Sequence, residues 1–178
     1  MNARSRAEHF LTASGARAIA HPGGTLFEHL ERTAALLESR RARPDLVLAG
    51  LCHASYGTGG FHTALLPLAQ RETLRELIGP RAEELVYRYC SCDREFPATL
   101  DEPERRLLRD RFTGEVLALD PQTMRDFLEL TYANELDVAR HTPDPALRAA
   151  LRGFLASLRC AVSDAAARAA ATLEGSKP

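Results

Sequence analysis

Two histidines and one asparagine have side chains that could do chemistry, and they fall where the helical pattern predicts burial. His29 comes three residues after Leu26 and four before Thr33, at the edge of an apolar stripe. His53 closes the most continuously apolar segment of the chain, and Asn134 falls on a third apolar stripe. Because a buried polar side chain needs a hydrogen-bond partner or a ligand, the three residues together predict a polar pocket in the core.

Histidine is suited to proton transfer near neutral pH, so such a pocket indicates acid–base chemistry. We expect His53, His29 and Tyr56 to be its catalytic residues. The residues expected to bind the ligand are Asn134, Thr58, Asp93, Arg94 and His21. Taken singly, each has a structural alternative. An inward histidine or asparagine is more often a satisfied core residue, His21 fits a turn, and the Asp93-Arg94 pair fits an exposed surface. Only the joint arrangement favours a site.

The elements that must position these residues are helices, because apolar residues recur at helical spacing over most of the chain. We expect an all-α helical bundle with helices near residues 7–14, 26–41, 44–52, 71–78, 80–90, 104–110, 121–141 and 145–173. Thr25 is a good N-cap, and Glu28 completes a capping box. The glycine-rich residues 56–60 must form a loop, and Thr113-Gly114 suggests one small β-hairpin within residues 111–119.

The length and composition indicate one globular domain. The chain has 178 residues, 45% of them hydrophobic and 26% charged, which excludes a wholly disordered protein. We expect a single domain over residues 1–178, with a core of about residues 20–140 followed by the C-terminal helix 145–173. Arginine outnumbers lysine, of which Lys177 is the single example, and this is typical of GC-rich bacterial coding.

Charge and hydropathy exclude several classes of partner. Lys and Arg total 23 against 24 Asp and Glu, so the basic excess of a nucleic-acid-binding protein is missing. No run reaches about 18 apolar residues, and the first residues lack an apolar signal segment, so we expect no membrane association. Four cysteines without zinc or redox spacing are expected to be reduced thiols in a cytoplasmic protein. The sequence is also compatible with a homodimer.

The order of the motifs resembles the HD-domain superfamily. That pattern has a histidine on one helix, a His-Asp pair ending a buried helix, and a distant Asp in a helical Ala-Asp-x-x-Asp context. This chain has His29, then Leu-Cys-His53-Ala-Ser-Tyr-Gly, then Ala-Asn134-Glu-Leu-Asp137. The stretches from His21 to His29, His53 to Thr58 and Tyr89 to Arg94 look like an uncharacterised bacterial family related to that superfamily. The resemblance covers about residues 20–140. It implies an HD-like helical bundle and a metal-dependent phosphohydrolase, or an oxygenase with paired irons.

Two departures from that pattern alter what it implies. Ala54 stands where the superfamily has the Asp of its His-Asp pair, and Asn134 stands where it has the late Asp. Carboxylates neutralise and bridge divalent ions, so we do not expect a dinuclear site. A single zinc, iron or manganese ion remains compatible with His29 and His53, with His21 or His62 as a third imidazole. Beyond such an ion we expect no cofactor.

These features predict a small-molecule enzyme on an HD-like fold, with a His-centred pocket and a degenerate metal site. The sequence does not distinguish hydrolase, isomerase, cyclase and oxygenase activity, and acid–base chemistry without a metal is included. The alternative is a non-catalytic HD-like protein that binds a ligand or a partner chain, which the residues Ala54 and Asn134 favour.

Overall fold

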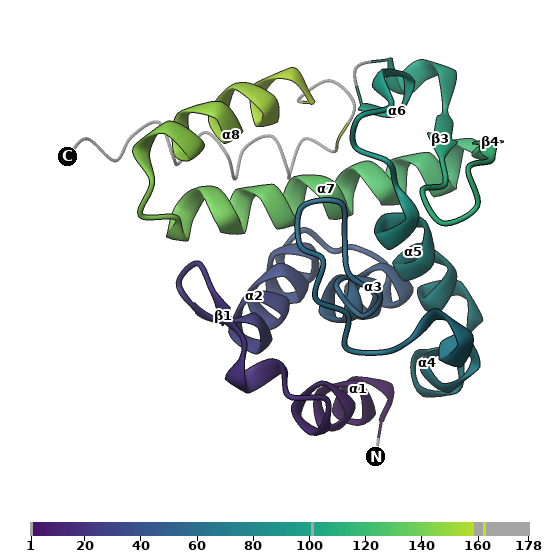
Figure 1. Cartoon of the computed structure of the whole chain (residues 1–178), viewed down its shortest axis with the longest axis vertical. Helices are drawn as coiled ribbons and strands as arrows, with labels where there is room; N and C mark the ends of the chain where they lie inside the picture. Colours follow the sequence, from purple (N-terminus) through teal and green to yellow (C-terminus); the bar gives the residue numbers. More distant parts are fainter. Residues whose placement is uncertain (1, 101, 159–161, 163–178) are drawn as a thin grey trace.

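The computed structural model describes residues 2–100, 102–158 and 162, and it is mostly helical (Figure 1). The helices are α1 (Ala3–Ala13), α2 (Leu26–Ser39), α3 (Pro44–Cys52), α4 (Arg71–Ile78), α5 (Pro80–Ser91), α6 (Pro97–Leu100), α7 (Pro121–His141) and α8 (Pro145–Ser157). The strands are β1 (Ala20–His21), β2 (Gly24–Thr25), β3 (Leu107–Arg109) and β4 (Val116–Ala118). The expectation of a helix-dominated chain is confirmed.

The long helix α7 organises the arrangement. It packs against α2, α3 and α5 on one side and against α8 on the other, and α1 packs against α3 and α4 (Figure 1). Buried side chains from these helices form one apolar core, in which Phe27, Tyr89, Phe127 and Tyr132 are the largest fully buried residues. The helix α3 lies inside this arrangement, which agrees with its nearly continuous apolar sequence.

Local sequence signals determine where α2 and α3 begin. The Thr25 side chain accepts a hydrogen bond from the backbone N–H of Glu28, and the Glu28 carboxylate accepts one from the backbone N–H of Thr25. This is the predicted capping box. Pro44 occupies the first turn of α3, where its missing N–H costs nothing. Gly50 allows α3 to approach α2, because a Cβ there would lie 2.5 Å from Leu37 Cδ1.

The β-structure differs in part from the expectation. A first antiparallel pair, β1 with β2, forms a short hairpin at His21, for which the sequence suggested only a turn as the structural alternative. A second pair, β3 with β4, replaces the end of the predicted helix 104–110, so that prediction was wrong. Pro103–Arg105 forms only a 3-10 turn, and Arg106 then adopts a left-handed φ of 53°, which ends helical geometry. The expected hairpin exists, but its first strand lies before residue 111.

The last predicted helix is seen in part. It begins at Pro145, capped by the Asp144 side chain, and α8 runs to Ser157. The remainder of the predicted range 145–173 lies almost entirely outside the described residues. No helix in the described ranges is both long and apolar enough to cross a membrane.

Candidate functional site

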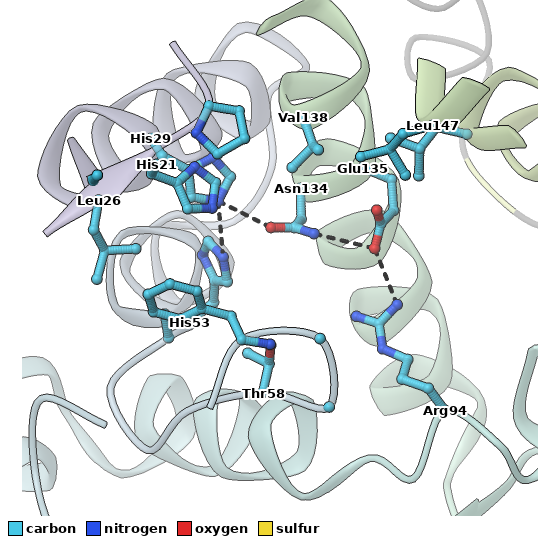
Figure 2. Close-up of a pocket in the computed structure, with 17 residues that line it drawn as sticks. His21, Leu26, His29, His53, Thr58, Arg94, Asn134, Glu135, Val138 and Leu147 are labelled. Carbon is cyan, nitrogen blue, oxygen red and sulfur yellow. Dashed lines mark hydrogen bonds and ion pairs between the residues drawn. The ribbon is translucent and has the colours of Figure 1, made fainter. Parts of the chain in front are cut away.

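A cavity of about 540 Å³ opens where the end of α3 meets α2, α7 and α8 (Figure 2). The β1–β2 hairpin and the glycine loop after α3 complete its walls. Its lining residues are Ala20, His21, Pro22, Leu26, His29, His53, Ala54, Thr58, Gly59, Gly60, Phe61, Arg94, Asn134, Glu135, Val138, Leu147 and Leu151.

His29 is held beside this cavity by Asp137, which itself forms an ion pair with Arg32. Its Nδ1 lies 2.7 Å from Asp137 Oδ2, and Arg32 donates to both Asp137 oxygens at 2.7 and 3.0 Å. Burial raises the pKa of Asp137, but the hydrogen bonds from His29 and Arg32 outweigh it and lower the pKa to about 2. The carboxylate is therefore ionised and accepts the Nδ1 proton. His29 Nε2 faces the cavity (Figure 2).

His53 is oriented by the backbone of its own helix. It is the C-cap residue of α3, and its Nδ1 lies 2.7 Å from the carbonyl oxygen of Gly50. A carbonyl can only accept, so Nδ1 carries the proton and Nε2 has the lone pair. Burial and the neighbouring His29 lower the pKa of His53 to about 3, so its ring is neutral at neutral pH. Its Nε2 lies 3.3 Å from Nε2 of His29.

Asn134 supplies a third polar atom from α7. Its Oδ1 lies 3.0 Å from His29 Nε2, and its Nδ2 donates to Glu135 Oε1 at 3.2 Å. Because a carboxylate can only accept, the Glu135 contact fixes which way the amide points. Glu135 Oε1 also accepts from Arg94 at 3.0 Å (Figure 2). Arg94 donates a second hydrogen bond to the hydroxyl of Tyr89.

His21 covers the His29 ring from the β1–β2 hairpin. The two rings stack with centroids 4.0 Å apart and planes 26° from parallel. Among the described residues, Nδ1 of His21 is buried without a hydrogen-bond partner. Burial and the neighbouring His29 lower the pKa of His21 to about 4. A second neutral imidazole therefore shields the site from solvent.

The structure brings most of the predicted site residues together. His29, His53 and Asn134 converge, and the cavity is also lined by His21, Thr58 and Arg94. Three other predicted residues lie elsewhere. Tyr56 donates its hydroxyl to Glu83, which Arg71 also binds; Asp93 pairs with Arg109; and His62 is exposed outside the lining. Tyr56 turns away from the cavity because its hydroxyl donates a hydrogen bond to the buried Glu83 carboxylate.

Sequence reasoning did not identify the acidic residues that complete the site. Asp137 follows Asn134 by three positions and Glu135 follows it directly, all on α7. Residues three apart share a helix face, so the spacing of Asn134 and Asp137 was a usable signal. Nothing local indicated Glu135, because its role depends on Arg94 from a distant loop.

The donor atoms fit one metal ion better than two. Neighbouring ligands of a tetrahedral ion with bonds of about 2.0–2.1 Å lie about 3.3 Å apart, which is the separation of the two histidine Nε2 atoms. Asp137 and the Gly50 carbonyl orient these rings as outer partners commonly do. Ala54 offers no carboxylate for a second ion. The rings of His21 and His29 are stacked, so the lone pairs in the two ring planes point in nearly parallel directions. They therefore do not converge on one metal ion.

The described part of the chain contains no group of three or more His, Cys, Asp or Glu side chains placed to hold a metal. An ion would therefore need the amide oxygen of Asn134 beside the two imidazoles.

One family comparison gives a match. The family DUF6817, described as a domain of unknown function, matches residues 10–94. This range contains His21, His29, His53 and Arg94, whereas Asn134 lies beyond it. No curated protein and no solved structure matches the chain. The likeness to the HD-domain superfamily thus stays a prediction from the motif order.

Proposed function

We propose that this protein is a small-molecule enzyme on an HD-like helical fold, in which His53 acts as a general base inside the cavity. The observation that carries the proposal is the state of His53. Its Nδ1–H is committed to the Gly50 carbonyl, its ring is neutral, and its Nε2 lone pair lies in the cavity wall beside His29. A general base must be unprotonated and must face space that a substrate can enter, and these two features of His53 support the proposal.

The second histidine gives the abstracted proton a stable environment. A proton taken by His53 Nε2 lies on the atom that is 3.3 Å from His29 Nε2. The far side of the His29 ring is bound to the ionised Asp137, whose charge stabilises positive charge on an imidazole. Arg32 keeps that carboxylate in place. The arrangement suits a reaction that begins with removal of a proton, as in isomerisation, cyclisation or activation of a hydrolytic water.

A single zinc, iron or manganese ion would be held by His29, His53 and Asn134. When bound, such an ion would polarise a substrate oxygen and lower the pKa of a bound water. The proton-transfer role of His53 is proposed for the metal-free protein. Elemental analysis of the purified protein shows whether it contains a metal ion or not.

Conversion of small molecules by matched variants tests the proposal. A pooled library of small molecules is incubated with the parent protein, His53→Gln and Ser55→Ala, and losses are followed by mass spectrometry. Ser55 is the control because it is buried two residues from His53, its hydroxyl has no partner among the described residues, and it does not line the cavity. We expect a compound that the parent and Ser55→Ala convert and that His53→Gln converts at least about 100-fold more slowly. Equal conversion by His53→Gln would refute the role of His53.

A non-catalytic ligand-binding protein is the second candidate. The observation in its favour is Ala54, which lines the cavity at the position where the HD pattern has a metal-binding carboxylate. Compounds that raise the melting temperature of the parent and remain chemically unchanged would support this candidate over the enzyme.

A further inference from the structure

The charges on the cavity wall cancel. Among the lining residues that the structure describes, only Arg94 and Glu135 have formally charged side chains, and they form an ion pair at 3.0 Å. The guanidinium of Arg94 also donates to the Tyr89 hydroxyl. Of the lining histidines, His29 is bound through Nδ1 to the Asp137 carboxylate at 2.7 Å, and His53 is bound through Nδ1 to the Gly50 carbonyl oxygen. An anionic ligand would find no uncompensated cation among the lining side chains.

Helix N-termini do not provide an anion site either. Free backbone N–H groups at a helix start are a common phosphate-binding device. Two helices begin beside the cavity, and each start already has a carboxylate of its own. Glu28 accepts from the backbone of Thr25 at the start of α2, and Asp144 accepts from the backbone N–H of Ala146 at the start of α8. A phosphate placed there would meet negative charge.

The polar atoms that face the cavity are mainly hydrogen-bond acceptors. His53 Nε2 has a lone pair, and Asn134 turns its carbonyl oxygen toward the histidines (Figure 2). Within the described ranges, the hydrogen bonds donated to Glu135 by side chains of Arg94 and Asn134 both go to Oε1, which leaves Oε2 as an acceptor there, and the side chain is 15% exposed. Acceptors are satisfied by O–H or N–H groups and are left unpaired by phosphate oxygens, which costs binding energy.

The rest of the wall is apolar. Leu26, Phe61, Val138, Leu147 and Leu151 line it, from α2, the glycine loop, α7 and α8. Such a surface binds a hydrocarbon portion of a ligand by removing it from water.

We infer that the cavity takes a neutral, partly apolar molecule that donates O–H or N–H hydrogen bonds to His53 and Glu135, and that it rejects phosphate esters. This inference deepens the proposed function, since it names the substrate class of the same site. It departs from the phosphohydrolase activity that the HD resemblance implies.

Two probes with the same ring and different head groups test the inference. Protein labelled with ¹⁵N-histidine is titrated at neutral pH with trans-cyclohexane-1,2-diol and with cyclohexyl phosphate, and the imidazole resonances of His29 and His53 are followed. We expect the diol to bind at least about tenfold more tightly than the phosphate, a difference of about 1.4 kcal/mol. Equal or tighter binding of the phosphate, or no response to either probe, would overturn the inference.

A charge variant tests the cause of this selectivity. Glu135→Gln removes the carboxylate partner of Arg94, whereas Glu115→Gln removes the same charge from an exposed position outside the cavity. We expect Glu135→Gln to bind cyclohexyl phosphate at least about tenfold more tightly than the parent, and Glu115→Gln to match the parent. If Glu135→Gln binds the phosphate no better, the Arg94–Glu135 pair is not what excludes anions. Should Glu135→Gln fail to fold, the two-probe comparison on the parent still decides.

Failure of this inference can be distinguished from failure of the proposed function. Binding of the diol without any His53-dependent conversion would refute the enzyme and leave the substrate class standing. A His53-dependent reaction on a phosphate ester would do the opposite.

Discussion

His29 and Asp137 are 108 positions apart in the chain, and their side chains meet at 2.7 Å. The contact makes His29 a donor at Nδ1 and turns its Nε2 toward Asn134 Oδ1 and His53 Nε2, at 3.0 and 3.3 Å. Asp137 in turn needs Arg32, because an ionised carboxylate that is only 2% exposed is costly without compensating partners. The chemistry of His29 therefore depends on two other residues, Asp137 and Arg32.

Replacing Asp137 should cost much more stability than replacing a paired carboxylate that is more exposed to solvent. Asp137→Asn leaves Arg32 without its buried partner, so we expect the free energy of unfolding to fall by about 3–5 kcal/mol in urea denaturation. Asp93→Asn is the control, because Asp93 also pairs with an arginine but its side chain is 22% exposed. Its expected loss is about 0–1 kcal/mol. Similar losses in the two variants would contradict a structural role for the buried ion pair.

Rebuilding the missing carboxylates should create a stronger metal site. Ala54 lines the same cavity as His53, just after α3 ends at Cys52. We expect Ala54→Asp combined with Asn134→Asp to bind zinc or manganese at least about tenfold more tightly than the parent, measured by calorimetry at neutral pH.

The metal-free double variant should also be less stable than the parent, since two partly buried carboxylates repel each other, and the ion should restore its melting temperature. A folded double variant with no gain in metal affinity would mean that the HD motif has been misaligned.

At the scale of elements, α2 is the part that fixes the site. Its first turn is held by the Thr25–Glu28 capping box, and His29 follows directly in the same turn of helix. Gly24, before the cap, has a φ of 131°, and a Cβ there would lie 2.1 Å from Glu28 Oε2. The connection between the hairpin that carries His21 and the helix that carries His29 therefore requires glycine at position 24.

Removal of the cap should destabilise the protein measurably. We expect Thr25→Ala to lower the free energy of unfolding by about 1 kcal/mol, because the backbone N–H of Glu28 loses its acceptor. Thr12→Ala provides the comparison, since Thr12 is exposed within α1 and its hydroxyl bonds back to the carbonyl of Glu8. Alanine is the better helix former, so that variant should change stability by less than about 0.5 kcal/mol. Equal effects would argue against the cap.

At the scale of the whole molecule, the helices bury neutral histidines among apolar side chains. His53 has a pKa of about 3 in the folded protein and 6.5 ordinarily, and His21 has about 4 against the same ordinary value. Over the interval between these values, the unfolded chain binds more protons than the folded one. Their contribution to stability is therefore complete above about pH 6.5 and is lost as the pH falls toward the folded values.

We expect the free energy of unfolding to decrease between about pH 6.5 and pH 4, by up to about 1.4 kcal/mol per pH unit for each histidine. Urea denaturation at a series of pH values measures this slope for the metal-free protein. His53→Gln should have a shallower slope than the parent, while His9→Gln, at an exposed position of α1, should keep it. A parent-like slope in His53→Gln would show that His53 does not titrate as its burial requires.

The sequence by itself determined the elements whose signals are local. The helices at Pro44, Arg71 and Pro121 begin where predicted, and the capping box at Thr25 forms as expected. Apolar periodicity, proline at the first turn and capping side chains act within a few residues, so they can be read before any fold is known. The same periodicity indicated that His29, His53 and Asn134 face inward.

Only the tertiary structure decided the features that depend on distant partners. The segment predicted as a helix at 104–110 becomes a strand because Leu107–Arg109 pairs with Val116–Ala118, and strand pairing is not encoded in one segment. Tyr56 lies outside the cavity, because its hydroxyl donates a hydrogen bond to the buried Glu83. Asp137 and Glu135 are part of the site because they bind Arg32 and Arg94. Buried polar groups must find partners wherever the fold brings them. The orientations and hydrogen-bond partners of the site residues therefore follow from packing rather than from sequence order.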